Sequence, residues 1–206
     1  MNQVGRRDGP VRILVLCTAN QCRSPVGAAL LRRRFTADGS NAEVLSAGVF
    51  GDGSPVPEVG QSVLAARGID LARHRSAPMT PVLVAGADLV VGMERSNVRE
   101  AVALVPEIWP RAFTFPDLIR RGHLFGPRSR GEPLERYLEK VGTGRQRDAL
   151  LGSSPDDDVT DPMGRDAKVW TQVVDDLEWL TSRLVALLAL PSAARSLRQA
   201  GAGGGG

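Results

Sequence analysis

The chain has 206 residues, of which 42% are hydrophobic and 24% charged, a composition typical of one soluble α/β domain. It excludes fibrous, membrane-embedded and largely disordered proteins, and two cysteines are too few for a disulfide framework or a cysteine-based metal site. The net charge of +3 favours anions, but aromatic residues make up only 4% and no nucleic-acid-binding signature occurs, so we expect no nucleic acid partner.

The N-terminal half alternates strand and helix patterns. Residues 1–10 are expected to form a flexible arm, and the apolar run at 11–16 is typical of a buried parallel strand. This run is too short for an export signal or a bilayer span, which predicts a cytoplasmic protein with no membrane partner. Ser24 and Pro25 then supply an N-cap and a first-turn proline for a helix. Further strands are predicted at 43–47, 87–91 and 112–115, with helices at 57–67 and 96–105.

The most basic part of the chain is residues 120–147. This stretch contains eight Arg or Lys residues and three Glu residues, which gives a local charge of +5. Glycines around a short helix at 133–141 suggest a mobile insertion near 120–150. Two interpretations stay open: a solvated loop, or a docking surface for an acidic protein partner.

The C-terminal part begins with three aspartates at 156–158 and the pair Asp161-Pro162. Residues 166–190 have the apolar spacing of a long amphipathic helix, and 191–206 form a flexible Gly-rich tail. The alternation predicts one α/β domain at 11–190, a doubly wound four-stranded parallel sheet with helices on both faces. Ligands in such sheets bind outside the carboxyl ends of the strands, where the segment from Cys17 to Ser24 would lie.

That segment carries the candidate chemistry. Backbone N–H groups of a tight loop leading into a helix bind a tetrahedral anion and favour the thiolate form of Cys17 at the floor of the loop. Arg23 offers a planar fork that matches two phosphoryl oxygens, and Ser24 can donate a hydrogen bond to the sulfur. Asn20 tolerates the left-handed backbone of such a loop. The predicted phosphate-binding residues are Thr18, Ala19, Asn20, Gln21, Cys22, Arg23 and Ser24.

The nine residues Cys17-Thr18-Ala19-Asn20-Gln21-Cys22-Arg23-Ser24-Pro25 match in full the Cys-x-x-Asn-x-Cys-Arg-Ser-Pro signature of the low-molecular-weight protein-tyrosine-phosphatase family, which the sequence resembles in its bacterial form. The resemblance extends over about 11–190, apart from the stretch near 120–150. Its further matches are Leu45-Ser46-Ala47-Gly48, Gly68-Ile69-Asp70-Leu71 through His74-Arg75, the segment 88–97, and Asp161-Pro162.

The resemblance implies a phosphatase that needs neither metal nor cofactor and acts on a phosphotyrosine protein or a small phosphate ester. Cys17 would attack phosphorus and form a cysteinyl-phosphate while Arg23 holds the oxygens. Asp161 would protonate the departing phenolate and then activate water. Asn20, Ser46 and His74 would support the loop.

Several alternatives stay open for single residues. Asp161 could be an ordinary turn residue, and Asp158 and Asp166 compete with it for the acid role. Cys22 could be a redox partner of Cys17 or could simply pack. Of the two aromatic residues that often flank the pocket of the family, one is Phe50 here and Met163 stands in place of the other, so the substrate could also be a small or non-aromatic phosphate ester.

Two other functions compete with the phosphatase. An arsenate reductase of the same fold would use the same cysteine and loop, and would need an external thiol because no cysteine follows Cys22. A phosphate-sensing module would dock an acidic partner through residues 120–147.

Overall fold

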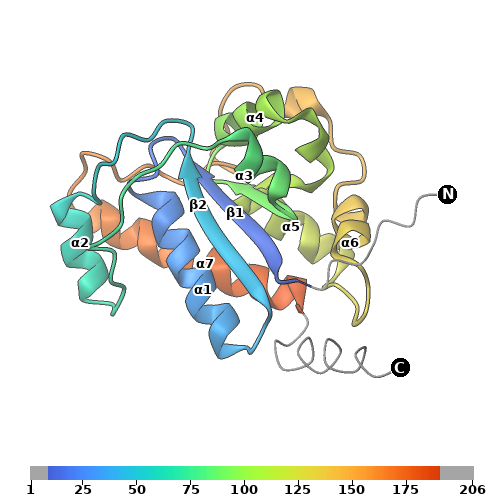
Figure 1. The fold of residues 1–206 in the computed structure, drawn as a ribbon, viewed down its shortest axis with the longest axis horizontal. Coiled ribbons are helices and arrows are strands. Elements are labelled where there is room, and N and C mark those ends of the chain that lie inside the picture. Colours follow the sequence, from blue (N-terminus) through green and yellow to red (C-terminus); the bar gives the residue numbers. More distant parts are fainter. Residues whose placement is uncertain (1–8, 191–206) are drawn as a thin grey trace, which may run out of the picture.

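The computed structural model describes residues 9–190, so the predicted tail and residues 1–8 of the predicted arm lie outside the described part. Four strands form one all-parallel sheet in the order β2-β1-β3-β4, which confirms the predicted α/β fold (Figure 1). The strands are β1 (Val11–Cys17), β2 (Ala42–Gly48), β3 (Leu89–Gly92) and β4 (Ala112–Thr114).

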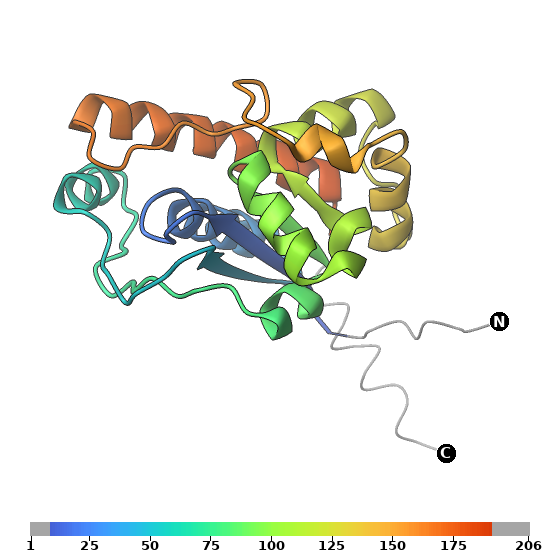
Figure 2. The same ribbon diagram turned by 90° about the horizontal axis from the view of Figure 1, so that it is seen from above.

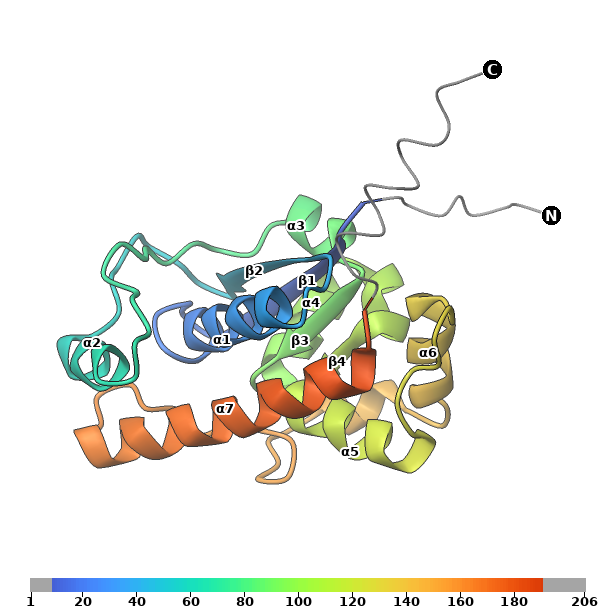
Figure 3. The ribbon, with the colours of Figure 1, turned by 90° about the horizontal axis from the view of Figure 1, so that it is seen from below.

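Helices cover both faces of this sheet (Figures 2 and 3). Side chains alternate along β1, so Ile13 and Val15 join one apolar core while Leu14 and Leu16 join another. The first core is built with α1 (Arg23–Ala37), α2 (Glu58–Ala65), α5 (Phe115–Phe125), α6 (Leu134–Val141) and α7 (Ala167–Leu188). The second is built with α3 (Pro81–Gly86), α4 (Arg95–Leu104) and the 3-10 helix η1 (Pro106–Arg111).

The long C-terminal helix is close to its prediction. Asp166 caps α7 by accepting a hydrogen bond from the Val169 amide at 3.0 Å. The apolar stripe that runs from Val173 to Leu187 is buried against the first core. Where α2 meets α7, the Trp170 ring lies so close to Gly60 that an added Cβ would be 2.4 Å from it. The glycine therefore sets how closely these two helices approach.

The stretch at 120–150 is more ordered than predicted, because besides the predicted short helix, seen as α6, the second half of α5 and the 3-10 helix η2 (Arg147–Leu150) lie in it. The Thr114 side chain caps α5, and Leu118, Ile119 and Gly122 bury one side of that helix. The predicted helix at 133–141 agrees with α6. Two helices, α3 and α5, were not predicted, since a short apolar turn and an arginine-rich run show little helical periodicity.

The topology fixes where a ligand would bind. The chain leaves β1 toward α1 on one face of the sheet and leaves β3 toward α4 on the other. Because the two connections diverge at the carboxyl edge of the sheet, this edge is where sheets of this kind bind their ligands. Cys17 ends β1 at this edge, and Glu94 follows β3.

Candidate active site

The loop between β1 and α1 departs from the predicted capping pattern. The helix begins at Arg23, and the N-cap residue Cys22 makes no side-chain cap, so Ser24 is not the N-cap. Ser24 lies one position inside the helix, where its hydroxyl turns to Cys17. The first turn of α1 contains no acidic residue, so the positive end of the helix dipole faces the loop uncompensated.

The Cys17 sulfur lies at the centre of this loop. The residue is only 2% exposed, the Asn20 amide donates to Sγ at 3.2 Å, and Ser24 Oγ lies 3.0 Å from Sγ. Ser24 Oγ also lies 3.3 Å from the Ala47 carbonyl oxygen, a longer contact. Because the hydroxyl has a single proton, the shorter contact favours donation to sulfur. Two donors, the Asn20 amide and the Ser24 hydroxyl, therefore converge on Sγ.

Asn20 is the structural centre of the loop. It is fully buried, and its φ of 53° is the left-handed conformation that the sequence predicted for it. Its side-chain Nδ2 donates to Ser24 Oγ at 2.9 Å and to Ser46 Oγ at 3.0 Å, and its Oδ1 accepts from the Ala77 amide at 3.0 Å. His74 Nε2 lies 2.7 Å from the Asn20 carbonyl oxygen, which can only accept, so Nε2 carries a proton. The predicted supporting residues Ser46 and His74 thus both contact Asn20, Ser46 at its side chain and His74 at its main-chain carbonyl oxygen.

Close backbone packing encloses the same loop. The Val49 and Phe50 amides donate to the carbonyl oxygens of Cys17 and Thr18, at 3.0 and 2.8 Å. A Cβ at Gly48 would lie 2.1 Å from the Phe50 carbonyl oxygen and 2.8 Å from the Asn20 nitrogen. Only glycine fits there, because any side chain would push the two loops apart.

Arg23 is the buried cation of the site, with 2% exposure. Nη1 donates to Glu94 Oε1 and to the Val159 carbonyl oxygen, and Nη2 donates to Asp161 Oδ2 at 3.0 Å and to Thr18 Oγ1 at 3.5 Å. Within residues 9–190, Arg23 Nε is the one buried side-chain nitrogen or oxygen without a hydrogen-bond partner. A buried guanidinium with an unused donor indicates a missing acceptor.

Two carboxylates flank this guanidinium, and sequence reasoning found one of them. Asp161 is 46% exposed in its side chain, and its Oδ1 accepts from the Met163 amide at 3.1 Å. Glu94 was missed as a site residue; its signal is a carboxylate directly after a buried strand, at the edge where ligands bind. The competing acids are engaged elsewhere: Asp158 accepts from the Arg95 and Ser154 amides, and Asp166 caps α7.

The second cysteine is buried beside the loop. Cys17 and Cys22 are both free, and burial, with the nearby Asp161 charge and Cys17, raises the pKa of Cys22 to about 12. Cys22 is therefore a neutral thiol near pH 7, and its redox role stays a prediction. At the rim, Phe50 and Met163 are 68% and 41% exposed.

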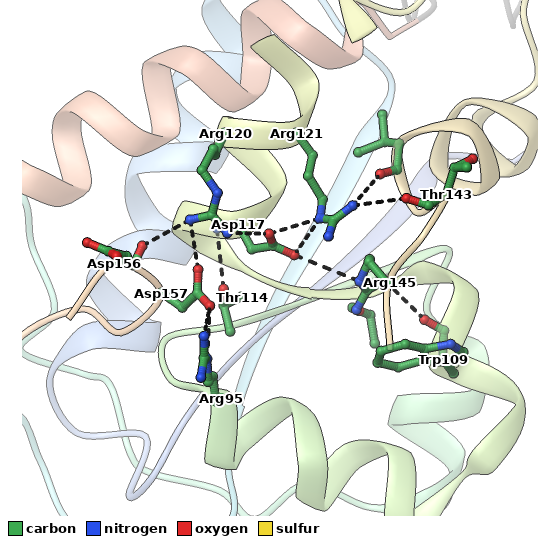
Figure 4. A network of polar contacts seen from close by, with 12 residues as sticks. Arg95, Trp109, Thr114, Asp117, Arg120, Arg121, Thr143, Arg145, Asp156 and Asp157 are labelled. Carbon is green, nitrogen blue, oxygen red and sulfur yellow. Dashed lines mark hydrogen bonds and ion pairs between the residues drawn. The ribbon is translucent and has the colours of Figure 1, made fainter. Parts of the chain in front are cut away.

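The basic stretch uses much of its charge within the fold (Figure 4). Arg121 and Arg145 pair with Asp117, and Arg120 pairs with both Asp117 and Asp157. Arg145 lies over the rings of Trp109 and Phe113, and burial lowers its pKa to about 10. Arg128 donates to main-chain carbonyl groups at the end of α7. These paired charges are less available to an acidic partner, so a docking surface at 120–147 stays a prediction.

Between residues 9 and 190, no group of three or more His, Cys, Asp or Glu side chains is arranged to hold a metal ion. In the same range, no helix combines the length and the apolar character that crossing a membrane requires.

A parallel sheet with a cysteine-centred anion loop at its carboxyl edge and a buried arginine behind it defines an anion-binding protein of the cysteine phosphatase class. The family model described as "Low molecular weight phosphotyrosine protein phosphatase" matches residues 12–123. The chain belongs to this family.

Individual relatives agree on the family and differ in substrate. The low molecular weight protein-tyrosine-phosphatase Etp of Escherichia coli (strain K12) is 32% identical over 116 residues, 56% of this chain and 76% of the relative. A protein-arginine-phosphatase of Geobacillus stearothermophilus is 30% identical over 176 residues, 85% of this chain and 94% of the relative. The crystal structure of a low molecular weight protein tyrosine phosphatase from T. tengcongensis superposes with a TM-score of 0.64 at 28% identity, covering 85% of this chain and 97% of that one.

Proposed function

We propose that this protein is a metal-independent phosphatase that hydrolyses phosphotyrosine, or a related phosphate monoester, through a cysteinyl-phosphate on Cys17. The observation that carries the proposal is the unpartnered Arg23 Nε in a guanidinium that is 98% shielded from solvent, on the loop whose donors converge on Cys17 Sγ. A phosphoryl group would supply the missing acceptor oxygens and place phosphorus in front of the sulfur.

The proposed reaction has two steps. In the first, Cys17 Sγ bonds to phosphorus, the phosphorus–oxygen ester bond breaks, and Asp161 gives its proton to the leaving oxygen. In the second, Asp161 takes a proton from water, the water oxygen bonds to phosphorus, and the sulfur–phosphorus bond breaks. The hydrogen bonds from Ser24 and from the Asn20 amide stabilise the thiolate both as attacking and as leaving group. Neither step needs a metal or a cofactor.

The test of this scheme is turnover of p-nitrophenyl phosphate and phenyl phosphate in the presence of EDTA, with wild type and Asp161→Asn. EDTA should leave the wild-type rates unchanged. The variant should lose about 10²-fold or more in kcat/KM for phenyl phosphate, because a general acid contributes that much, and less for the better leaving group p-nitrophenolate.

Three results would contradict the proposed reaction. A folded wild type that turns over neither ester but reduces arsenate with an external thiol would be the competing reductase. Phosphate binding without either reaction would favour a sensor. If Asp161→Asn lost the same factor in kcat/KM on both esters, Asp161 would not be the general acid.

Phosphoarginine is the second candidate substrate. The arginine phosphatase relative matches 85% of the chain, whereas the tyrosine phosphatase relative Etp matches 56%. Glu94 and Asp161 bind a guanidinium in this structure, that of Arg23, and Asp161 is exposed enough to meet another. The exposed rim residue Phe50 offers one aromatic surface for stacking on a phosphotyrosine ring.

Two peptides of one sequence, phosphorylated on Tyr or on Arg at the same position, separate these substrates. We expect a higher kcat/KM for the phosphotyrosine peptide, and Phe50→Ala should raise its KM by about two- to tenfold, the value of one aromatic contact. The exposed Val82→Ala on α3 is the control, because it removes apolar surface of a separate helix. A phosphoarginine peptide consumed at least as efficiently, with no response to Phe50→Ala, would assign the arginine substrate.

A further inference from the structure

The segment that carries Asp161 has no regular secondary structure of its own. Residues 151–166 connect η2 to α7, and Asp161 itself is half-exposed and contacts Arg23 and the Met163 amide. A general acid must stay within hydrogen-bonding distance of the leaving oxygen to act. Something outside Asp161 must therefore hold this segment over the site.

We propose that Asp157 is a positioning residue for Asp161, and that its ion pairs with Arg95 and Arg120 fix the acid-bearing segment over the loop. The inference rests on the proposed acid role of Asp161 and adds three residues to the site. Within residues 9–190, none of the three makes a hydrogen bond or ion pair with Cys17 or Arg23.

Asp157 joins the segment to two helices at once (Figure 4). Its Oδ2 accepts from Arg95 Nε at 2.8 Å and Nη2 at 2.6 Å, and its Oδ1 accepts from Arg120 Nη1 at 2.8 Å. Arg95 begins α4 and Arg120 lies in α5, and these helices pack on opposite faces of the sheet. The carboxylate thus bridges helices on the two faces of the sheet.

The attachment continues toward the catalytic loop. Asp158 Oδ1 accepts from the Arg95 amide at 2.8 Å, and the Val159 amide donates to the Met93 carbonyl oxygen at 2.7 Å. The Val159 carbonyl oxygen accepts from Arg23 Nη1 at 2.9 Å, and two residues later Asp161 meets Nη2 of the same guanidinium. A displacement of Asp157 would therefore pass along the chain to Asp161, which lies four positions later.

The pair geometry suits a fixed anchor. The Asp157 side chain is 11% exposed, so water screens its ion pairs less than it screens surface pairs. Burial raises the pKa of Asp157, but the hydrogen bonds from Arg95 and Arg120 outweigh burial and lower it overall. Because its pKa is lowered, the carboxylate stays charged below its ordinary titration range, so the ion pairs persist at neutral and mildly acidic pH and are lost only as pH falls through the lowered pKa.

The experiment compares Asp157→Asn with the matched control Asp156→Asn, an exposed aspartate one residue away that loses the same charge. The readout is the ratio of kcat/KM for p-nitrophenyl phosphate to that for phenyl phosphate, because a misplaced acid penalises the poorer leaving group. We expect Asp157→Asn to raise this ratio about tenfold, part of the effect of removing a general acid, and Asp156→Asn to leave it unchanged. Inhibition by inorganic phosphate should change less than about twofold, since the loop around Cys17 is intact, whereas general structural damage would weaken it.

A second variant keeps the inference testable if Asp157→Asn does not fold. The Arg120 side chain is half-exposed, so Arg120→Gln removes one of the two arginines with little loss of packing. It should raise the ratio in the same direction but less, about threefold, because Arg95 still holds Asp157.

The outcomes separate the two proposals. An unchanged ratio in folded Asp157→Asn, or in Arg120→Gln where the former does not fold, overturns the positioning role while Asp161→Asn still shows the steep leaving-group dependence. If Asp161→Asn itself left the ratio unchanged, Asp161 would not be the general acid, and the positioning role of Asp157 would fall with it.

Discussion

Cys17→Ser should abolish turnover of p-nitrophenyl phosphate, with a loss on the order of 10⁵-fold or more, the scale seen when a covalent nucleophile is removed. A serine hydroxyl has a far higher pKa than a thiol, so the Ser24 and Asn20 donors that stabilise a thiolate cannot ionise it. Serine is also close in size to cysteine, so the loop should still bind inorganic phosphate. Initial rates together with calorimetric titration of phosphate separate the two effects.

Acid-quenched mass spectrometry provides the control. During turnover the wild type should carry one added phosphoryl group on Cys17. Cys22→Ser should still be labelled on Cys17, since the Cys22 thiol, with a pKa of about 12, stays protonated at working pH. Activity of Cys17→Ser above about 1% of the wild type would contradict the nucleophilic role, because such a loss is far below that of a missing nucleophile.

Arg23→Lys should lose about 10³-fold in kcat/KM, although the charge is kept. The arginine offers Nε and Nη donors in one plane, and removal of a single preorganised donor to a developing oxyanion costs about 10²- to 10³-fold. Lysine supplies a point charge with no fork, and its ammonium group would face Glu94 and Asp161 without matching both. The measurement is kcat/KM, with the inhibition constant of inorganic phosphate rising in parallel.

Arg33→Lys is the matched control for this prediction. Arg33 lies on the same helix α1, but its side chain is 49% exposed and its ion pair with Glu178 spans 3.5 Å. Exposed pairs contribute little, so this variant should keep wild-type kinetics and thermal stability. An Arg23→Lys enzyme within tenfold of wild type would show that charge alone, and not the planar fork, holds the phosphoryl group.

The loop around Cys17 was largely predictable because its constraints are local. A strand, a short turn and a helix N-terminus follow within a few residues, and the left-handed φ of Asn20 suits its residue type. The predicted support from Ser46 and His74 came from the family resemblance, and the structure brings both to Asn20. The predicted N-cap at Ser24 is wrong because a serine near a helix start can either cap the helix or turn its hydroxyl to another group, and the local pattern does not distinguish the two.

The arginine-rich stretch was not predictable in the same way. Its charges suggest a solvated loop as long as their partners are unknown. Asp117, Asp157 and the end of α7 supply those partners only when α5 and α6 fold against the sheet. Glu94 was missed for the same reason, since its role depends on Arg23, which is 71 residues away in the chain.

The sequence by itself determined the family, the alternation of strands and helices, and the residues of the anion loop, because these depend on short-range spacing and backbone preference. The tertiary structure alone decided that Glu94 and Asp161 share one guanidinium and that Arg23 Nε is left without a partner. It also decided that Asp157 pairs with Arg95 of α4 and Arg120 of α5, which pack on opposite faces of the sheet. Ion pairs between residues far apart in the sequence form where the fold brings them together and excludes water, and neither condition can be predicted from the spacing of residues along the sequence.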